Sequence, residues 1–414
     1  EIRSSKPQLS KHMFWYNNGS HLNASTGNKK GFSMPLDYLE IRQEIETLAS
    51  LAPERAKQLK SKQEQAIEWL REYANELDYL RDKAERANQL LPHFHVALPT
   101  GEPLNSSILL PTQPADLTLL AADGSQINPD RHMGTDYCLV NIGAIRMLPG
   151  SGLAPETTIK SNLYYGDEVL SLPEEIVAMM RDVRERQILA ELAANLPGPV
   201  ITLTDGPLEL WNQGGTSPQK DELKQRYFDA LKQLHLMKAV TAGYVDRPRN
   251  ALLMRLLEIA PASVQPKDAG EAHPLLGLLD TDVLARVIKP GERSAIFGLL
   301  TRASREYRDQ FALHFFYLNV SMRAEKPVIA KVDIPAWVAA DDAMVNSLHA
   351  ALVAQCQVMS AVCYPYVLTR ADEIAVVTRK DKQKVADMIA SALRSSGQDV
   401  IGHSSKQQGK EAAR

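Results

Sequence analysis

Residues 119–130 read LLAADGSQINPD, an apolar run that gives way to an acidic residue, Asp123. A short apolar run that stops at turn-forming residues predicts a buried strand, here one that begins near residue 116 and stops at Asp123. Gly124 and Ser125 favour a turn after it. An acid at the end of a buried strand is held in place on the rigid edge of a sheet. We therefore predict that Asp123 is a metal-ligand carboxylate.

A second stretch repeats this arrangement. Residues 199–211, PVITLTDGPLELW, predict a buried strand that leads into Asp205 and a glycine. Divalent cations such as Mg²⁺ and Mn²⁺ prefer carboxylate oxygens, and a glycine after the acid allows a substrate to approach the backbone closely. The alternative is that Asp123 and Asp205 belong to ordinary Asp-Gly turns, which reverse the chain without any ligand.

Glu185 is a third acidic candidate. It falls on a predicted helix, residues 174–196, and most of its neighbours on that helix are apolar. A carboxylate on the flank of a buried face needs a partner or a metal ion. The alternative partner is Arg181, four residues earlier, and Glu191 is a second candidate for the ligand on this helix.

The segments around these acids predict a mixed sheet. Residues 138–148 and 157–169 are predicted strands that follow the first one in an antiparallel meander, and residues 364–378 are predicted to hold a turn and a strand. Further strands are predicted at 294–300, 312–320 and 327–335, and further helices at 223–240, 344–359 and 381–396. A meander followed by strands that alternate with helices predicts an α/β fold with helices on the faces of the sheet.

A helical extension is predicted over residues 34–92. Apolar residues recur every three or four positions over 36–91, which is typical of one helix or a helical hairpin, and Pro92 ends it. The extension suits dimerisation or docking, and the alternative is that it packs on its own domain. Residues 1–33 lack this periodicity and are expected to be a disordered or non-native leader, or alternatively a basic DNA-binding arm.

Composition narrows the class of protein. The 414 residues carry a formal net charge of −3, so any contact with nucleic acid would need a local basic surface. His132 is a candidate loop residue near the site, and the basic tail at 403–414 is a candidate DNA contact. Three cysteines without a CxxC pair argue against a zinc site or a disulfide framework, and they favour the cytoplasm.

Several sequence motifs are absent. The chain has no GxxxxGK[ST], no HExxH, no GxSxG and no GxGxxG after a strand, which removes the support for P-loop ATPases and for most hydrolases and dehydrogenases. No apolar run reaches the length of a membrane span, so we expect no membrane contact.

The ordered set of strand-Asp-Gly-Ser, helix-Glu and strand-Asp-Gly-x-Leu resembles the NurA nuclease family. The segments AGYVDRP, GERSAIF and YPYVLTRADE support this resemblance, which covers about residues 116–406. It implies an RNase H-like α/β domain, a mixed β-sheet flanked by helices. It also implies a manganese-dependent nuclease with 5′-to-3′ exonuclease and single-strand endonuclease activity on DNA. The family further implies a homodimer that docks on a hexameric HerA-type ATPase to resect DNA ends.

The resemblance assigns site residues by motif. Asp123, Glu185 and Asp205 match the acidic metal ligands, and Tyr364 matches the tyrosine of the YP segment. Asp372 stands where the family pattern has histidine. Aspartate can bind Mn²⁺ through oxygen, but it lacks the acid–base capacity of imidazole near neutral pH.

These observations predict a metal-dependent DNA nuclease that uses Mn²⁺, with Mg²⁺ as the alternative ion. Two metal ions would neutralise the phosphodiester, activate a water molecule and stabilise the leaving oxygen. The resemblance implies a role in DNA end resection and double-strand break repair with the HerA-type ATPase. The chain has no motor motif of its own, which explains why such a partner is needed. The alternative is a catalytically weakened, DNA-binding scaffold subunit, which Asp372 favours.

Overall fold

The computed structural model describes residues 37–129, 137–166, 169, 172–210, 217–271, 273–359 and 362–397. The predicted leader at 1–33, His132 and the basic tail at 403–414 lie outside these residues. The chain divides into two compact units, one up to Arg55 and one from Ala56 onward.

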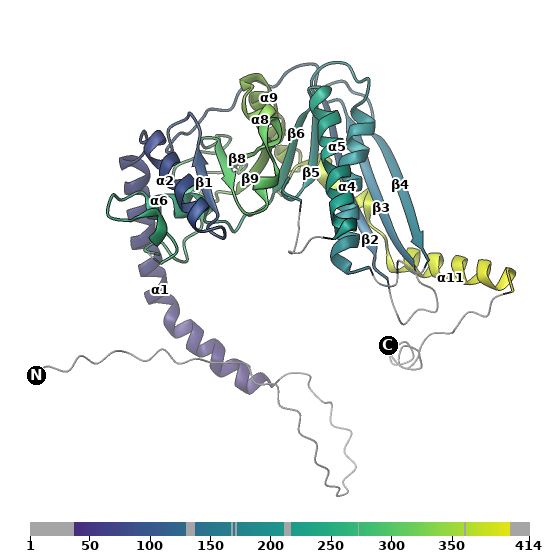
Figure 1. The fold of residues 1–414 in the computed structure, drawn as a ribbon, viewed down its shortest axis with the longest axis horizontal. Coiled ribbons are helices and arrows are strands. Elements are labelled where there is room, and N and C mark those ends of the chain that lie inside the picture. Colours follow the sequence, from purple (N-terminus) through teal and green to yellow (C-terminus); the bar gives the residue numbers. More distant parts are fainter. Residues whose placement is uncertain are drawn as a thin grey trace, which may run out of the picture. The chain divides into compact units, whose positions relative to one another are not determined.

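In the described residues, nine strands form one mixed sheet in the order β1-β7-β8-β9-β6-β5-β2-β3-β4 (Figure 1). The strands are β1 (Val96–Pro99), β2 (Thr118–Ile127), β3 (Tyr137–Met147), β4 (Glu156–Tyr165), β5 (Val200–Asp205), β6 (Val240–Val245), β7 (Phe297–Leu300), β8 (Leu313–Asn319) and β9 (Ile329–Pro335). The predicted meander is confirmed as β2, β3 and β4, which pair antiparallel. β5 pairs parallel to both β2 and β6.

β2 is a strand with both faces covered, and this explains its continuous apolar run. Its residues 119–122 are completely buried, and it is hydrogen-bonded to β3 on one side and β5 on the other. The prediction that the strand stops at Asp123 is wrong, because β2 continues through Gly124 and Ser125 to Ile127. Asp123 therefore lies inside a strand and not at a turn.

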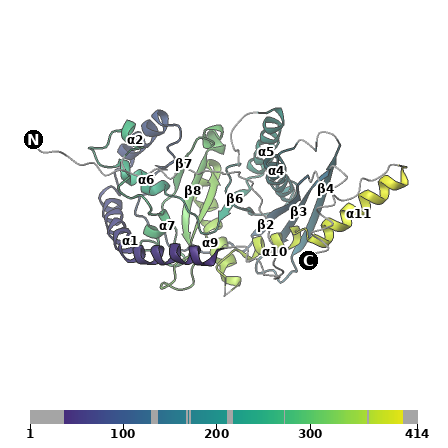
Figure 2. The same cartoon turned by 90° about the horizontal axis from the view of Figure 1, so that it is seen from below.

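Helices cover both faces of this part of the sheet. The α-helices of the described residues are α1 (Tyr38–Glu72), α2 (Leu77–Leu90), α4 (Glu174–Ala193), α5 (Pro218–Leu236), α6 (Leu252–Ile259), α7 (Asp280–Leu284), α8 (Ala336–Ala339), α9 (Asp342–Val358), α10 (Tyr366–Ala375) and α11 (Arg379–Ser395). α4 and α5 lie on one side of β2–β4, and α10 lies on the other (Figure 2). α11 begins with a capping box between Thr378 and Asp381, which satisfies two free donors of its first turn.

The strand predicted within residues 364–378 is wrong. This segment forms α10, which begins after Pro365 and buries Val367, Leu368, Ala371 and Ala375. That spacing places the apolar side chains on one face of a helix, and the helix lies against β2 and β3. The consequence for the site is that Asp372 comes from a helix.

The N-terminal segment forms two helices, α1 and α2, and α2 ends just before Pro92, as predicted. Apolar side chains from Ala66 to Ala87 belong to the main core, and β1, which follows, pairs with β7. The first part of α1, up to Arg55, instead exposes Tyr38, Ile41, Ile45, Leu48 and Leu51. Among the described residues, no helix is long and apolar enough to cross a membrane.

Candidate active site

Asp123 lies opposite Gly143 of β3 in the antiparallel register, so its side chain faces the side of the sheet on which α10 packs. Its Oδ1 atom accepts a hydrogen bond of 2.7 Å from the Gly124 N–H. Burial raises the pKa of Asp123 to about 6, and the charges of Asp205 and Asp372 add to this shift. These two acids are therefore close enough to act on Asp123 although they come from distant parts of the chain.

Asp205 is the last residue of β5 and is exposed at its carboxyl end. The chain turns directly after it, because Gly206 has a φ of +84°, and the Gly206 N–H donates a 2.8 Å hydrogen bond to the Tyr244 carbonyl. The following loop is held by Tyr227, whose hydroxyl donates to the Leu208 carbonyl at 2.7 Å. Asp205 thus sits on a fixed strand end, as the sequence predicts.

The same loop is also held by a buried carboxylate, that of Asp333. Asp333 Oδ2 accepts a 3.3 Å hydrogen bond from the Leu208 N–H, and Asp333 also forms a buried ion pair with Lys331 of β9. Gly243 lies opposite Asp333 on β6, and a Cβ at Gly243 would come within 2.6 Å of the Gly206 carbonyl. The turn after Asp205 is therefore packed against neighbouring backbone and anchored by a buried acid.

Glu185 is buried in α4, with 6% of its surface exposed. Its pKa is well above its usual range, first because of burial and then because of the charges of Asp182 and Asp123, while Arg181 acts in the opposite direction. Arg181 Nε lies 3.5 Å from Glu185 Oε1, so the alternative ion pair is present. Glu191 instead pairs with Arg184 at 2.7 Å.

Gly124 is what brings β2 and α4 this close together. A Cβ at this position would lie 2.8 Å from Glu185 Oε1 and 2.5 Å from Arg181 Cγ. The predicted role of this glycine was to let a substrate approach, but the space beside it is filled by side chains of α4. The glycine lets Glu185 approach the strand from the face opposite to the one that Asp123 faces.

Tyr364 lies just before α10, and Asp372 lies in the second half of this helix. Asp372 is exposed on the helix. The Tyr364 ring packs edge-on against Tyr244, with centroids 5.4 Å apart. Burial raises the pKa of Tyr364 above its usual range, and the charge of Asp205 and its hydrogen bond with the tyrosine add to the effect. Tyr364 therefore has both a packing role and a contact with Asp205.

Ser125 and Asn141 hold α10 in place, a role that sequence reasoning missed. Ser125 Oγ and Asn141 Nδ2 donate to the Ala375 carbonyl at 2.5 Å and 2.8 Å. Ser161 Oγ donates to Asn141 Oδ1 at 2.7 Å. The only signal for this network was the serine of the DGS motif, which we had assigned to a turn.

Asp246, directly after β6, is a further acid beside the group. Burial raises its pKa, Arg247 lowers it, and the charge of Asp205 raises it. The sequence analysis used the segment AGYVDRP, which contains Asp246, only as support for the family resemblance. Within the described residues, however, no three or more His, Cys, Asp and Glu side chains lie close enough together to hold a metal ion. The acids are brought to one edge of the sheet and influence one another, without forming such a tight cluster.

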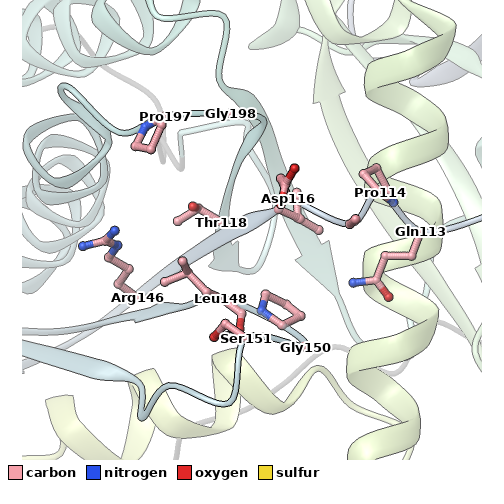
Figure 3. A pocket seen from close by; sticks show the side chains of 13 residues that line it. Gln113, Pro114, Asp116, Thr118, Arg146, Leu148, Gly150, Ser151, Pro197 and Gly198 are labelled. Atoms are coloured by element: carbon pink, nitrogen blue, oxygen red, sulfur yellow. Dashed lines mark hydrogen bonds between the residues drawn. The ribbon is translucent and has the colours of Figure 1, made fainter.

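A pocket of about 850 Å³ lies elsewhere, at the start of β2. Figure 3 shows Asp116, Thr118 and Arg146 around it, together with backbone near Pro197 and Gly198. Because β2 and β5 run parallel, this pocket lies at the opposite end of β5 from Asp205. It is therefore separate from the carboxylate group.

Residues 117–377 match the family model of the NurA domain, which is more than half of the chain. The chain belongs to the NurA domain family. The predicted architecture, a mixed α/β sheet flanked by helices with a helical N-terminal part, is confirmed. All five predicted site residues of this NurA domain lie within the matched range.

Solved structures resemble this NurA protein at low identity. A crystal structure of NurA with manganese is 11% identical, covers 69% of this chain and 91% of its own, and gives a TM-score of 0.40. Another crystal structure of NurA is 12% identical, with 80% and 98% covered and a TM-score of 0.38. The catalytic domain of human endonuclease V is 12% identical, with 76% and 98% covered and a TM-score of 0.32. No match was found among curated proteins.

Proposed function

We propose that this protein is a metal-dependent deoxyribonuclease whose centre is formed by Asp123, Glu185, Asp205 and Asp372, with Tyr364 beside it. The observation that carries the proposal is the electrostatic coupling of Asp123 to Asp205 and to Asp372, which come from β2, β5 and α10. Membership of the NurA family supports the same reaction.

The oxygen donors of these residues suit a hard divalent cation by their chemistry, although in the described part of the chain they are not gathered into a tight cluster. Carboxylate oxygens are the ligands that Mn²⁺ and Mg²⁺ prefer. When burial and neighbouring negative charges raise the pKa of an acid, a nearby cation stabilises its ionised form most. Asp123, Asp205 and Asp372 would hold the ion, and Glu185, which approaches Gly124 from α4, would be the fourth acid near it. When bound, the ion supplies charge neutralisation for the phosphodiester and activation of water.

The chain's own residues position the reacting groups. Asp123 is fixed by its pairing with Gly143 of β3, directly after the residues of β2 that also pair with β5. Asp205 is fixed by the turn at Gly206. The Tyr364 hydroxyl, beside Asp205, would orient a phosphate oxygen or a water molecule. Arg247 is exposed next to the acidic edge and would pair with a DNA phosphate.

The test is a cleavage assay with 5′-labelled and 3′-labelled DNA, single- and double-stranded, in Mn²⁺, Mg²⁺ or EDTA. We expect cleavage that needs the metal, with 5′-to-3′ exonuclease and single-strand endonuclease products. Asp205→Asn should lower the rate by at least a hundredfold, because it removes one ligand charge. Asp229→Asn, at an exposed position of α5, is the matched control. Equal loss in both variants, or cleavage in EDTA, would overturn the proposal.

A second candidate function is a DNA-binding scaffold with weakened catalysis. The observation that favours it is Asp372, an exposed acid on α10 at the position where the NurA pattern has histidine. The variant Asp372→His separates the two functions. An inactive wild type that gains metal-dependent cleavage through this substitution would support the scaffold, whereas an active wild type would exclude it.

The proposed setting is DNA end resection in double-strand break repair in the cytoplasm, together with a HerA-type hexameric ATPase. The chain has none of the ATP-binding motifs sought in its sequence, so movement along DNA would depend on that partner. The apolar side chains exposed on the first part of α1, residues 38–51, would serve docking or a homodimer. Co-purification with the ATPase and the mass in solution, each compared with Ile45→Glu, test these contacts.

A further inference from the structure

A positively charged side chain lies among the acids of the site. Arg181 Nη2 is 2.8 Å from Asp182 Oδ1, and Arg181 Nε is 3.5 Å from Glu185 Oε1. Its charge also opposes the upward shift in the pKa of Asp123. Arg181 therefore forms an ion pair with Glu185, and Arg186 is a second cation that lowers the pKa of this acid.

The position of Arg181 is built into the packing of α4 on β2. Gly124 leaves room for its side chain, since a Cβ there would lie 2.5 Å from Arg181 Cγ. Arg181 is one turn before Glu185, so the helix holds the two on the same face. The arginine cannot be dismissed as a solvated surface charge, because only about a third (34%) of its side chain is exposed.

Burial raises the pKa of Glu185, so its ionised form is costly without a nearby cation, and Arg181 supplies one. A divalent ion bound to Glu185 would also neutralise this carboxylate, but it would then lie next to the Arg181 guanidinium. Like charges at such distances repel. Two cations therefore compete for one acid.

We propose that Arg181 is a built-in counter-ion that competes with the divalent metal ion for Glu185 and weakens metal binding. This inference rests on the proposed metal centre. Asp182 makes the exchange feasible, because its hydrogen bonds of 2.8 Å and 3.2 Å keep the guanidinium paired after Glu185 is released. Arg181 is thus a positioning residue that sets the metal affinity of the site.

The test measures Mn²⁺ binding to the metal-free full-length protein by titration calorimetry, without DNA. Arg181→Gln is expected to bind Mn²⁺ about tenfold more tightly than the wild type, equivalent to about 1.4 kcal/mol. Arg181→Lys keeps the charge and should stay close to the wild type. Arg184→Gln is the matched control, because Arg184 is on the same helix, is 21% exposed, and pairs with Glu191 instead.

Thermal unfolding gives a second readout that does not depend on cleavage. In EDTA, Arg181→Gln should melt at a lower temperature than the wild type, because Glu185 loses its ion-pair partner. Adding Mn²⁺ should raise its melting temperature more than that of the wild type, because a ligand that binds more tightly stabilises more.

The outcomes separate this inference from the proposed function. Unchanged or weaker Mn²⁺ binding in Arg181→Gln, while the wild type binds and Asp123→Asn does not, would overturn the counter-ion role and leave the metal centre standing. If neither the wild type nor Arg181→Gln binds Mn²⁺, the metal centre and the counter-ion role both fail. Tighter binding in Arg181→Gln alone, with Arg184→Gln unchanged, would support the inference.

Discussion

Gly143→Ala is predicted to separate α10 from the sheet. A Cβ at Gly143 would lie 2.5 Å from the Ala375 nitrogen, 2.7 Å from the Ala371 carbonyl oxygen and 2.8 Å from the Ile374 carbonyl carbon. All three atoms belong to the backbone, so no side-chain rotation relieves the contact. Since carbon contacts are normally about 3.5–4.0 Å, α10 would have to move away by about 1 Å.

The cost follows from what that movement breaks. Ser125 and Asn141 donate to the Ala375 carbonyl at 2.5 Å and 2.8 Å, and a shift of about 1 Å takes both hydrogen bonds to or beyond their useful range. Each is worth about 0.5–1.5 kcal/mol, and overpacking of a core costs about 1–3 kcal/mol in general. We therefore expect the free energy of unfolding to fall by about 3 kcal/mol.

Urea unfolding followed by circular dichroism measures this change. Gly101→Ala is the control, because a Cβ at Gly101 meets nothing within 4 Å and should leave stability nearly unchanged. In Gly143→Ala the displaced helix should also carry Asp372 away from Asp123, so Mn²⁺ binding should weaken. A loss of stability below about 0.5 kcal/mol, the usual size of a surface substitution, would refute the close packing described for α10.

Two further predictions concern buried charges. Lys331→Met should lower the free energy of unfolding by about 3–5 kcal/mol, because it leaves Asp333 buried without its cation. Urea unfolding of a double variant that adds Asp333→Asn should recover part of this loss, and no recovery would argue against the ion pair as the cause. Asp123→Asn in EDTA should gain stability over the wild type as pH rises from about 4 to about 6. The pKa of Asp123 is about 6 in the folded protein, whereas its ordinary value is 3.8, so the folded state binds the proton more readily than the unfolded state. The wild type therefore loses stability as this proton dissociates with rising pH. Urea midpoints between pH 4 and 8 measure this, and a difference that does not change with pH would contradict the burial of Asp123.

The sequence predicted the strands well wherever apolar residues formed a run bounded by turn residues. β3, β8 and β9 were located this way, and β5 was predicted to end near Asp205. The prediction failed in the DGS motif, because glycine and serine usually favour a turn. In this fold they are strand residues, since Gly124 makes room for α4 and Ser125 binds α10.

The failure at α10 has a different cause. Its β-branched and aromatic residues favour a strand, but the buried positions Val367, Leu368, Ala371 and Ala375 follow a helical period that is too short to stand out. β1, with four residues, was missed for a similar reason. The five candidate site residues were named from sequence motifs, and Arg181 was named as a partner of Glu185. Asp182 and Asp246 could not be predicted as neighbours of the acids. Their positions depend on how α4 and β6 meet the edge of the sheet.

The order of the acids along the chain has a consequence for the newly made protein. Asp123 and Asp205 are translated early, whereas Asp372 belongs to α10, whose place on the sheet depends on bonds to Ala375. A ribosome must therefore add more than 160 residues after Asp205 before the last carboxylate can join the others. A product of premature termination within that interval would carry three of the four acids, Asp123, Glu185 and Asp205, and lack the helix that supplies the fourth.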